Sequence, residues 1–323
     1  MVMAAAFGGQ GPFSHHDHRP VLLRETIELL AAERGGLFVD CTVGLGGHSE
    51  AILQAASDAQ VLGIDRDEEA LLLARKRLAI YGSRFRAVHA DFRELTRVLA
   101  TAKVGPVRGI LADLGVSSLQ LDSPQRGFSF RHEAPLDMRM DRSSGATASD
   151  LLGRLSEVEI ARLIFEYGEE PRSRRIARAI VGRRERGEPV RTTSDLASLV
   201  ERAAGPGKKR RIHPATRTFQ ALRIAVNAEL ENLDHFLSEA VDHLEPAGRL
   251  AVISFHSLED RIVKRTLLKL SGRCQCPPRL PECICGAVKR ITVLTRRAIK
   301  PAAAELDENP RARSAKLRGA QKV

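Results

Sequence analysis

Short apolar runs alternate with helix-like segments through the first third of the chain, and this alternation restricts the fold more than any other feature. An apolar run of four or five residues, bounded by turn residues, is typical of a strand buried on both faces of a parallel sheet. Strands that alternate with helices indicate βαβ units, so we predict an α/β fold with helices on both faces of the sheet. The expected strands are residues 37–40, 61–65, 85–89 and 109–113, and the expected helices are residues 20–33, 49–56, 68–80 and 93–99. In the third of these helices we expect Leu72, Leu73 and Leu78 to point inward.

A long insert separates the fourth strand from the fifth, which we expect at residues 250–254. A βαβ unit needs only about 30 residues. One apolar stripe from Phe219 to Leu244 predicts the crossover helix, so the residues before it are additional. They read as all-helical, with a capping box of Ser156 and Glu159 at one helix start. Further expected elements are helices at residues 174–183 and 194–200, a strand at residues 291–294, and a basic, proline-broken tail.

These patterns divide the chain into four parts. The first is small, rich in glycine and expected to be disordered. The sheet domain is interrupted by the helical insert and ends in the basic tail. The predicted boundaries are 1–17 for the disordered tail, 18–140 for the first part of the sheet domain, 141–212 for the insert, and 213–323 for the second part.

The charge of the chain favours a nucleic-acid partner. The net charge is +11 at pH 7, and the basic residues are clustered in Lys289–Lys322, Arg172–Arg191 and Lys208–Arg211. Such blocks commonly contact phosphate backbones. The chain has no Trp and two Tyr, which argues against a generic single-strand binder that stacks bases on many aromatic rings.

Hydropathy and cysteine content favour the cytoplasm. No run of 18 apolar residues could span a membrane, and the N-terminus lacks the features of a signal peptide. Four of the five cysteines lie close together, which is unlike a secreted disulfide framework. The pairs Cys274/Cys276 and Cys283/Cys285 could hold zinc, although their spacing is not the usual Cys-x-x-Cys. The alternative is a proline-rich loop with reduced thiols.

A glycine-rich turn and an acid predict a nucleotide site. Gly44-x-Gly46-Gly47 follows the first strand, and Asp65 ends the second, where an acid commonly binds ribose hydroxyls. The turn is not a complete Gly-x-Gly-x-x-Gly, because Ser49 replaces the last glycine. Asp65 could instead cap the next helix, a role that Asp67 could also fill, and His48 could simply be a polar residue at a helix start.

Both NAD and S-adenosylmethionine carry a ribose diol, so the choice of cofactor needs further residues. Asp113 ends the fourth strand, at the switch region where such folds bind ligands. Phe92 follows the third strand and could stack on adenine or anchor the following helix in the core.

Several long polar strings resemble one known family closely. The motifs are Gly44-Leu-Gly-Gly-His-Ser49, Asp113-Leu-Gly-Val-Ser-Ser-Leu-Gln-Leu-Asp122, Arg126-Gly-Phe-Ser-Phe130, Pro135-Leu-Asp-Met-Arg-Met-Asp141, Tyr167-Gly-Glu-Glu170, the string from His213 to Leu230, and Ser254-Phe-His-Ser-Leu-Glu-Asp-Arg261. With these motifs, which are highly specific, the chain resembles the RsmH (MraW) family of bacterial 16S ribosomal RNA cytosine-N4 methyltransferases. The resemblance covers about His18 to Lys316.

The resemblance implies a class I (Rossmann-like) methyltransferase sheet with an inserted all-helical domain. It implies S-adenosylmethionine as cofactor and methylation of the N4 amine of a cytidine in the decoding centre. The partner would be 16S ribosomal RNA or the small ribosomal subunit, with neither membrane nor DNA, and no metal in the site. The two cysteine pairs are not part of the general family pattern. The family's cofactor contacts match Gly46, Gly47, His48, Asp65, Phe92, Asp113 and Gln120.

Methyl transfer to cytosine N4 needs an acceptor for the amine protons, because the nitrogen lone pair is delocalised into the ring. Asp113 is the candidate catalytic residue, with backbone carbonyls of its Leu114–Ser117 loop as equal partners. Asp113 could equally be a pure cofactor contact. The target base must be flipped out or already unpaired. Phe128, Phe130 and Phe255 are possible stacking partners or core residues, and His256 could contact the base or phosphate, or be structural.

Two rival functions fit parts of the sequence. A nucleic-acid binding module without catalysis is disfavoured by the intact Gly46, Asp65 and Asp113. A DNA amino-methyltransferase would carry an Asn/Asp/Ser-Pro-Pro-Tyr/Phe string after the fourth strand, where this chain has Asp-Leu-Gly-Val.

Overall fold

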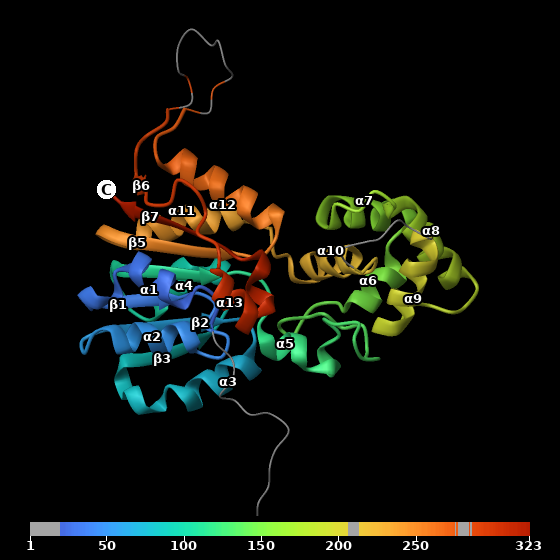
Figure 1. Cartoon of the computed structure of the whole chain (residues 1–323), viewed down its shortest axis with the longest axis horizontal. Coiled ribbons are helices and arrows are strands. Elements are labelled where there is room, and N and C mark those ends of the chain that lie inside the picture. The colour runs from blue at the N-terminus through green and yellow to red at the C-terminus, as the bar shows by residue number, and fades with distance from the viewer. Residues whose placement is uncertain (1–19, 206–212, 275, 277–283, 285) are drawn as a thin grey trace, which may run out of the picture.

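The computed structural model describes residues 20–205, 213–274, 276, 284 and 286–323. A twisted sheet with helices on both faces forms one part of the molecule, and a separate group of helices lies beside it (Figure 1). The expected disordered tail, residues 1–17, and the basic run Lys208–Arg211 fall outside the described residues. None of the helices in the described part combines the length and apolar character that crossing a bilayer requires.

The sheet has seven strands in the order β3-β2-β1-β4-β5-β7-β6. The first five in this order pair in parallel, whereas β7 is antiparallel to both β5 and β6. All five strands expected for the parallel sheet are therefore present, which confirms the α/β class. The strands are β1 (Leu37–Asp40), β2 (Gln60–Asp65), β3 (Phe85–His89), β4 (Val107–Asp113), β5 (Leu244–Ser254), β6 (Ile291–Val293) and β7 (Lys316–Lys322).

Helices cover both faces of the sheet because each face presents apolar side chains. One apolar core joins the strands to α4, α11 and α12, and a second joins the opposite face to α1 and α2, with Leu78 just beyond α3. The helices are α1 (Leu23–Leu30), α2 (Gly47–Ala55), α3 (Glu68–Arg77), α4 (Leu95–Thr101), α11 (Leu233–His243), α12 (Ser257–Leu270) and α13 (Ala303–Glu308). Short 3-10 helices are η1 (Ala32–Arg34), η2 (Ala79–Arg84), η3 (Phe92–Glu94), η4 (Pro124–Arg126) and η5 (Pro310–Ser314).

The helical group has an apolar core of its own, contributed by segments between β4 and β5. Short polar side chains cap several of its helices at their N-termini. Ser156 and Glu159 form the expected capping box, and Thr147 and Thr192 begin two neighbouring helices in the same way. The domain boundaries at residues 140 and 213 remain predictions. The helices are α5 (Ser118–Asp122), α6 (Ala148–Arg154), α7 (Glu157–Gly168), α8 (Ser173–Glu185), α9 (Thr193–Ala204) and α10 (Thr216–Asn227).

The single crossover helix expected from Phe219 to Leu244 is wrong, because the structure has two helices there. The chain breaks between α10 and α11, where Ala228 and Asn232 have positive φ angles of 51° and 56°. The physical reason is that the two halves of the apolar stripe face different cores. Phe219 of α10 packs in the helical group, whereas α11 packs against the sheet.

Two smaller expectations also need correction. Leu72 is 51% exposed, and the neighbouring Leu71 takes the buried position on α3. The basic tail contains strand β7, whose Lys316 and Arg318 both bond Asp260 of α12 at 2.9 and 2.7 Å. These two cations are therefore engaged within the protein.

Candidate functional site

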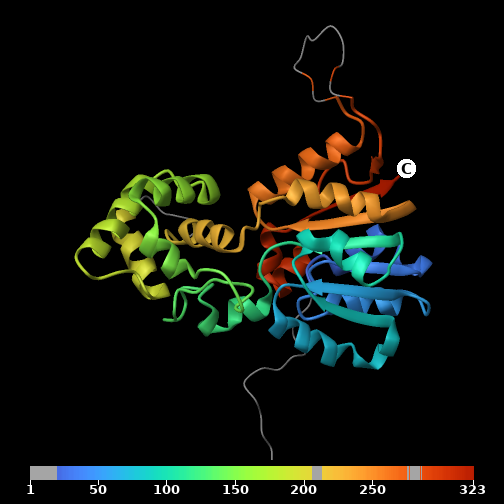
Figure 2. The same ribbon diagram turned by 180° about the vertical axis from the view of Figure 1, so that it is seen from behind.

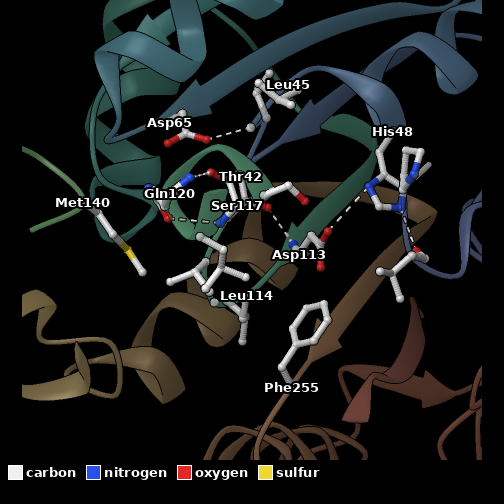
Figure 3. A pocket seen from close by; sticks show the side chains of 18 of the residues that line it. Thr42, Leu45, His48, Asp65, Asp113, Leu114, Ser117, Gln120, Met140 and Phe255 are labelled. Atoms are coloured by element: carbon white, nitrogen blue, oxygen red, sulfur yellow. Dashed lines mark hydrogen bonds and ion pairs between the residues drawn. The ribbon is translucent and has the colours of Figure 1, made fainter. Parts of the chain in front are cut away.

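A cavity of about 400 Å³ lies at the carboxyl ends of the parallel strands. The strand order runs outward in opposite directions from β1 and β4, so this is the switch point at which α/β sheets bind ligands. Figure 3 shows Asp65, from the end of β2, and Asp113, from the end of β4, lining the same pocket. The volume is in the range of small-molecule sites.

The turn after β1 is fixed to the end of β2 by one carboxylate. The Gly44 N–H donates to Asp65 Oδ2 at 2.7 Å, and the Asp67 N–H donates to Asp65 Oδ1 at 2.9 Å. Burial raises the pKa of Asp65 to about 6, although these two bonds oppose the shift. Each oxygen has further acceptor capacity, because a carboxylate oxygen can accept two hydrogen bonds. Asp65 is thus placed to accept from hydroxyls of a ligand in the cavity.

The alternative role as helix cap belongs to Asp67. Its carboxylate accepts from the backbone N–H groups of Glu69 and Ala70 at the start of α3. The same side chain bonds the buried Arg126 at 2.7 Å and Gln120 at 2.8 Å. Arg126 is therefore a buried structural residue that shares Asp67 with the cavity-lining Gln120, a role that its motif did not indicate.

Asp113 lines the pocket at the end of β4. Its N–H donates to Thr42 Oγ1 at 2.6 Å, and its Oδ2 lies 3.7 Å from His48 Nδ1. Within the described part of the chain, Asp113 Oδ1 is buried and has no hydrogen-bond partner. Burial, together with the charges of Asp40 and Glu259, raises the pKa of Asp113 well above its usual range. The Asp113 carboxyl therefore keeps its proton to a higher pH than usual, and its Oδ1 can accept a hydrogen bond from a ligand.

Six of the seven expected cofactor residues line this cavity, namely Gly47, His48, Asp65, Phe92, Asp113 and Gln120. Gly46 does not line it. Gly46 has a φ of 82° just before α2, and a Cβ there would lie 3.1 Å from Leu78 Cδ1. It shapes the turn from behind, where a left-handed conformation and a close neighbour both favour glycine.

Like Asp65, three others of the six have side chains engaged with the protein. His48 Nε2 lies 3.1 Å from the Val21 carbonyl, and Gln120 Oε1 accepts from the Ser117 N–H at 3.0 Å. Phe92 packs edge-on against Phe236 with ring centroids 4.8 Å apart, and it also lines the cavity. The sequence allowed Phe92 to be either a core anchor or a contact for the ligand. In the structure it packs in the core and also faces the cavity.

The opposite wall contains residues that the sequence did not assign to the site. They come from the helical group and from the segment after β5. Hydrophobic periodicity could not show that these segments lie beside the glycine turn after β1. Phe255 is the one member that the sequence proposed, whereas Phe128 is buried in the helical core and Phe130 stacks on His213. The unassigned residues are Met140, Arg223, Glu229, Glu259, Asn309, Arg311 and Ser314.

Glu259 bonds several residues of this wall to one another. Its Oε2 accepts from the N–H groups of Phe255 and His256, and its Oε1 lies 3.1 Å from His256 Nε2. Although burial opposes ionisation, His256 and Arg223 hold the pKa of Glu259 below its usual value. His256 also caps α12. These contacts favour the structural interpretation of His256.

Glu229, His256 and Glu259 are a group whose ligand atoms lie within 4.8 Å of one another. Protein donors occupy them, since Arg223 donates two bonds to Glu229 at 2.9 and 2.8 Å and Glu259 accepts two backbone bonds. The group is accordingly an ion-pair network beside the cavity.

Neither alternative for the cysteine pairs, zinc ligands or a loop with reduced thiols, is tested by the described residues. Cys274 is exposed and Cys276 half-buried, with the Cys276 N–H 3.4 Å from Cys274 Sγ. Cys283 and Cys285 lie outside the described residues.

Known proteins resemble this chain over nearly its whole length. The family model described as the MraW methylase family matches residues 15–323. A protein of Geobacter sulfurreducens named ribosomal RNA small subunit methyltransferase H is 52% identical, covering 95% of this chain and 99% of the relative. A protein of Carboxydothermus hydrogenoformans with the same name is 49% identical, covering 95% and 98%. The chain therefore belongs to the MraW methylase family.

Proposed function

We propose that this chain methylates the N4 amine of a cytidine in the decoding centre of 16S ribosomal RNA. Its relatives are named as methyltransferases of small-subunit ribosomal RNA, and the cofactor of such a methyltransferase is S-adenosylmethionine. The observation that carries the proposal is the single cavity that places Asp65 and the glycine turn on one side and Asp113 and Phe255 on the other. A cofactor and a target base would meet there.

The residues present fit S-adenosylmethionine. The buried, unpartnered Asp113 Oδ1 and the spare acceptor capacity of Asp65 call for donors such as an amine and ribose hydroxyls. Asp65 would accept from the ribose, Phe92 would contact the adenine, and Gly47, His48 and Gln120 would complete the wall, with Gly46 supporting the turn. The bound cofactor supplies an electrophilic methyl group on a sulfonium.

Asp113 is the candidate acceptor for the N4 protons. A carboxyl with a raised pKa is a stronger base once it has lost its proton, which suits the removal of a proton from an amine as it becomes bonded to carbon. The backbone carbonyls of residues 114–117 remain the alternative, because this loop lines the same cavity. Positioning by either group would orient the amine without any covalent step on the protein.

The base would reach Asp113 past Phe255. A base in a stacked duplex is inaccessible, so it must be unpaired or flipped out, and an aromatic face can replace the lost stacking. Phe255 lines the cavity and packs on the Gly115 loop, where a Cβ at Gly115 would lie 3.4 Å from the Phe255 ring. Phe128 and Phe130 lie in the helical core and do not line this cavity.

Nucleoside analysis tests the proposal. Small-subunit RNA from cells lacking the gene should miss one N4-methylated cytidine, and the purified protein with S-adenosylmethionine should restore it. Methylation at a ring carbon, at a ribose hydroxyl, or on another base would contradict the N4 assignment. Absence of cofactor binding in calorimetry would instead favour the rival interpretation as a binding module.

A further inference from the structure

A second cavity of about 390 Å³ adjoins the first, at the junction between the helical group and the sheet. It is lined by the end of α7, the first turns of α10 and α12, and residues 300 and 313–316. In Figure 1, α10 of the helical group and the start of α12 lie where the two parts of the molecule meet. Phe255 and Ser314 line both cavities, so the two spaces meet at these residues.

The charge of this second cavity is positive. Lys300 and Arg313 are exposed, and neither has an ion pair with any described residue. Lys316 is neutralised by Asp260 at 2.9 Å. Glu169, the acid in the lining, is occupied by Ser257 at 2.9 Å and by Arg261 at 3.2 Å. Two cations are therefore available to a ligand.

Arg217 and the start of α10 add to this positive potential. The Arg217 guanidinium donates to the Glu169 carbonyl at 3.0 Å and lies 3.9 Å from Glu170, so its charge is only loosely compensated. Helix α10 has 12 residues, and no side chain caps its N-terminus. Its first turn contributes Thr216 to the lining. The Thr216 N–H donates to the His213 carbonyl at 3.1 Å, so the favourable term for an anion at this end is the helix dipole.

We infer that this second cavity binds a backbone phosphodiester of the RNA strand, next to the nucleotide whose base enters the first cavity. The inference rests on the proposed function and deepens it. A base and its phosphate lie on either side of one sugar, so a base that passes Phe255 leaves its backbone at the mouth shared by both cavities. Lys300 and Arg313 would make the charge-assisted contacts to the phosphate oxygens.

Salt-dependent binding to protein-free 16S ribosomal RNA, taken from cells that lack the gene, tests this assignment. Each lost phosphate contact lowers the log–log salt slope by about 0.7–0.9. The double variant Lys300→Ala/Arg313→Ala should therefore bind this RNA more weakly and show a slope lower by at least about 0.7. Its KM for RNA should rise while kcat at saturating RNA is kept, because ground-state binding is what is lost.

Two controls separate charge from folding and from general basicity. Lys300→Arg/Arg313→Lys keeps both charges and should retain the wild-type slope. Arg34→Ala/Lys76→Ala removes two exposed cations from η1 and α3 that line neither cavity, and should also retain it. A wild-type slope in the double alanine variant, or an equal loss in the Arg34/Lys76 variant, would overturn the inference.

The outcome is independent of which atom receives the methyl group. If wild-type protein methylates this RNA elsewhere than cytosine N4, the proposed function fails while the salt slopes still decide the phosphate assignment. The double alanine variant could instead bind protein-free RNA normally and be impaired only on assembled subunits. In that case the second cavity contacts a ribosomal protein, and the phosphodiester assignment is wrong.

Discussion

At the scale of single residues, the chemistry at the end of β2 depends on two acids with separate tasks. Asp67 holds α3, Gln120 and Arg126 from within the protein, whereas Asp65 holds the glycine turn and faces the cavity. The sequence could name both acids but could not divide the roles, because the division depends on where the α3 backbone begins. Asp67 is 2% exposed, which identifies it as the structural member.

Replacing Asp65 should weaken cofactor binding without unfolding the protein. Asp65→Asn removes the charge, and charge-assisted hydrogen bonds contribute about 1.5–3 kcal/mol each. We expect S-adenosylmethionine affinity to fall at least tenfold in calorimetry. Since the pKa of Asp65 is about 6, wild-type affinity should also decrease as pH falls through that value, whereas the variant should lose this pH dependence. Identical pH profiles would show that the ribose binds elsewhere.

Asp113→Asn distinguishes a chemical role from a cofactor contact. The amide keeps the size of the side chain and can still accept one hydrogen bond, but it cannot remove a proton. If Asp113 polarises the N4 amine, the single-turnover rate at saturating cofactor should fall by about 10²–10⁴-fold while affinity changes little. If it only touches the cofactor, affinity should fall and the rate should survive. A rate within about threefold of wild type would transfer the role to the carbonyls of residues 114–117.

At the scale of elements, strand β7 shows what periodicity cannot reveal. Its sequence, Lys316-Leu-Arg-Gly-Ala-Gln-Lys322, lacks the apolar run of a central strand, so it reads as a basic tail. It nevertheless pairs with both β5 and β6. Arg318 is only 9% exposed, and its charge is paired with Asp260 of α12. The parallel strands were predictable because each carries its apolar signal locally, whereas β7 depends on a partner distant in sequence.

Removing that partner should destabilise the sheet. Asp260→Asn leaves Arg318 and Lys316 without a counter-ion, and an uncompensated buried charged group costs about 1–3 kcal/mol in the free energy of unfolding. Although burial opposes ionisation, Arg318 and Lys316 lower the pKa of Asp260 in the folded protein. The stabilisation is therefore complete above the pKa of Asp260 in the unfolded chain, and it is lost as the pH falls through the lower pKa of the folded state. Urea unfolding at neutral and acid pH should show the difference between variant and wild type shrinking in acid.

The matched control is an exposed ion pair on the helical group. Arg162 and Glu166 of α7 are bonded at 2.9 Å, but their side chains are 74% and 46% exposed. Glu166→Gln should change the unfolding free energy by less than about 1 kcal/mol, because solvent screens such pairs. An equally small effect of Asp260→Asn would mean that β7 is held by its backbone pairing alone.

At the scale of the whole molecule, the sheet and the helical group have separate apolar cores joined by polar contacts. Figure 2 shows the two parts side by side. Glu169 at the end of α7 bonds Ser257 and Arg261 of α12, and the Arg66 guanidinium, just after β2, donates to the Asn227 carbonyl of α10 at 2.8 Å. The insert was predictable from the spacing between strands. The cavity wall that it and the segment after β5 supply was not, because no local pattern states which distant loops will meet.

Separate cores imply that a ligand of the glycine turn should stabilise the two parts unequally. S-adenosylhomocysteine, which shares the ribose and adenine of the cofactor, should bind beside β1, β2 and β4. At a hundred times its dissociation constant, a ligand stabilises the state it binds by about 2.7 kcal/mol. We expect amide hydrogen exchange in those strands to slow by that amount, while α8 and α9, whose apolar residues lie in the helical core, gain clearly less. Exchange without ligand provides the baseline, and Asp65→Asn at the same ligand concentration should gain no more than about 1.4 kcal/mol in the same strands, because a tenfold loss of affinity leaves the ligand at about ten times the dissociation constant. Equal gains in β4 and α9 would mean that the two cores unfold as one cooperative unit and that the polar contacts couple them fully.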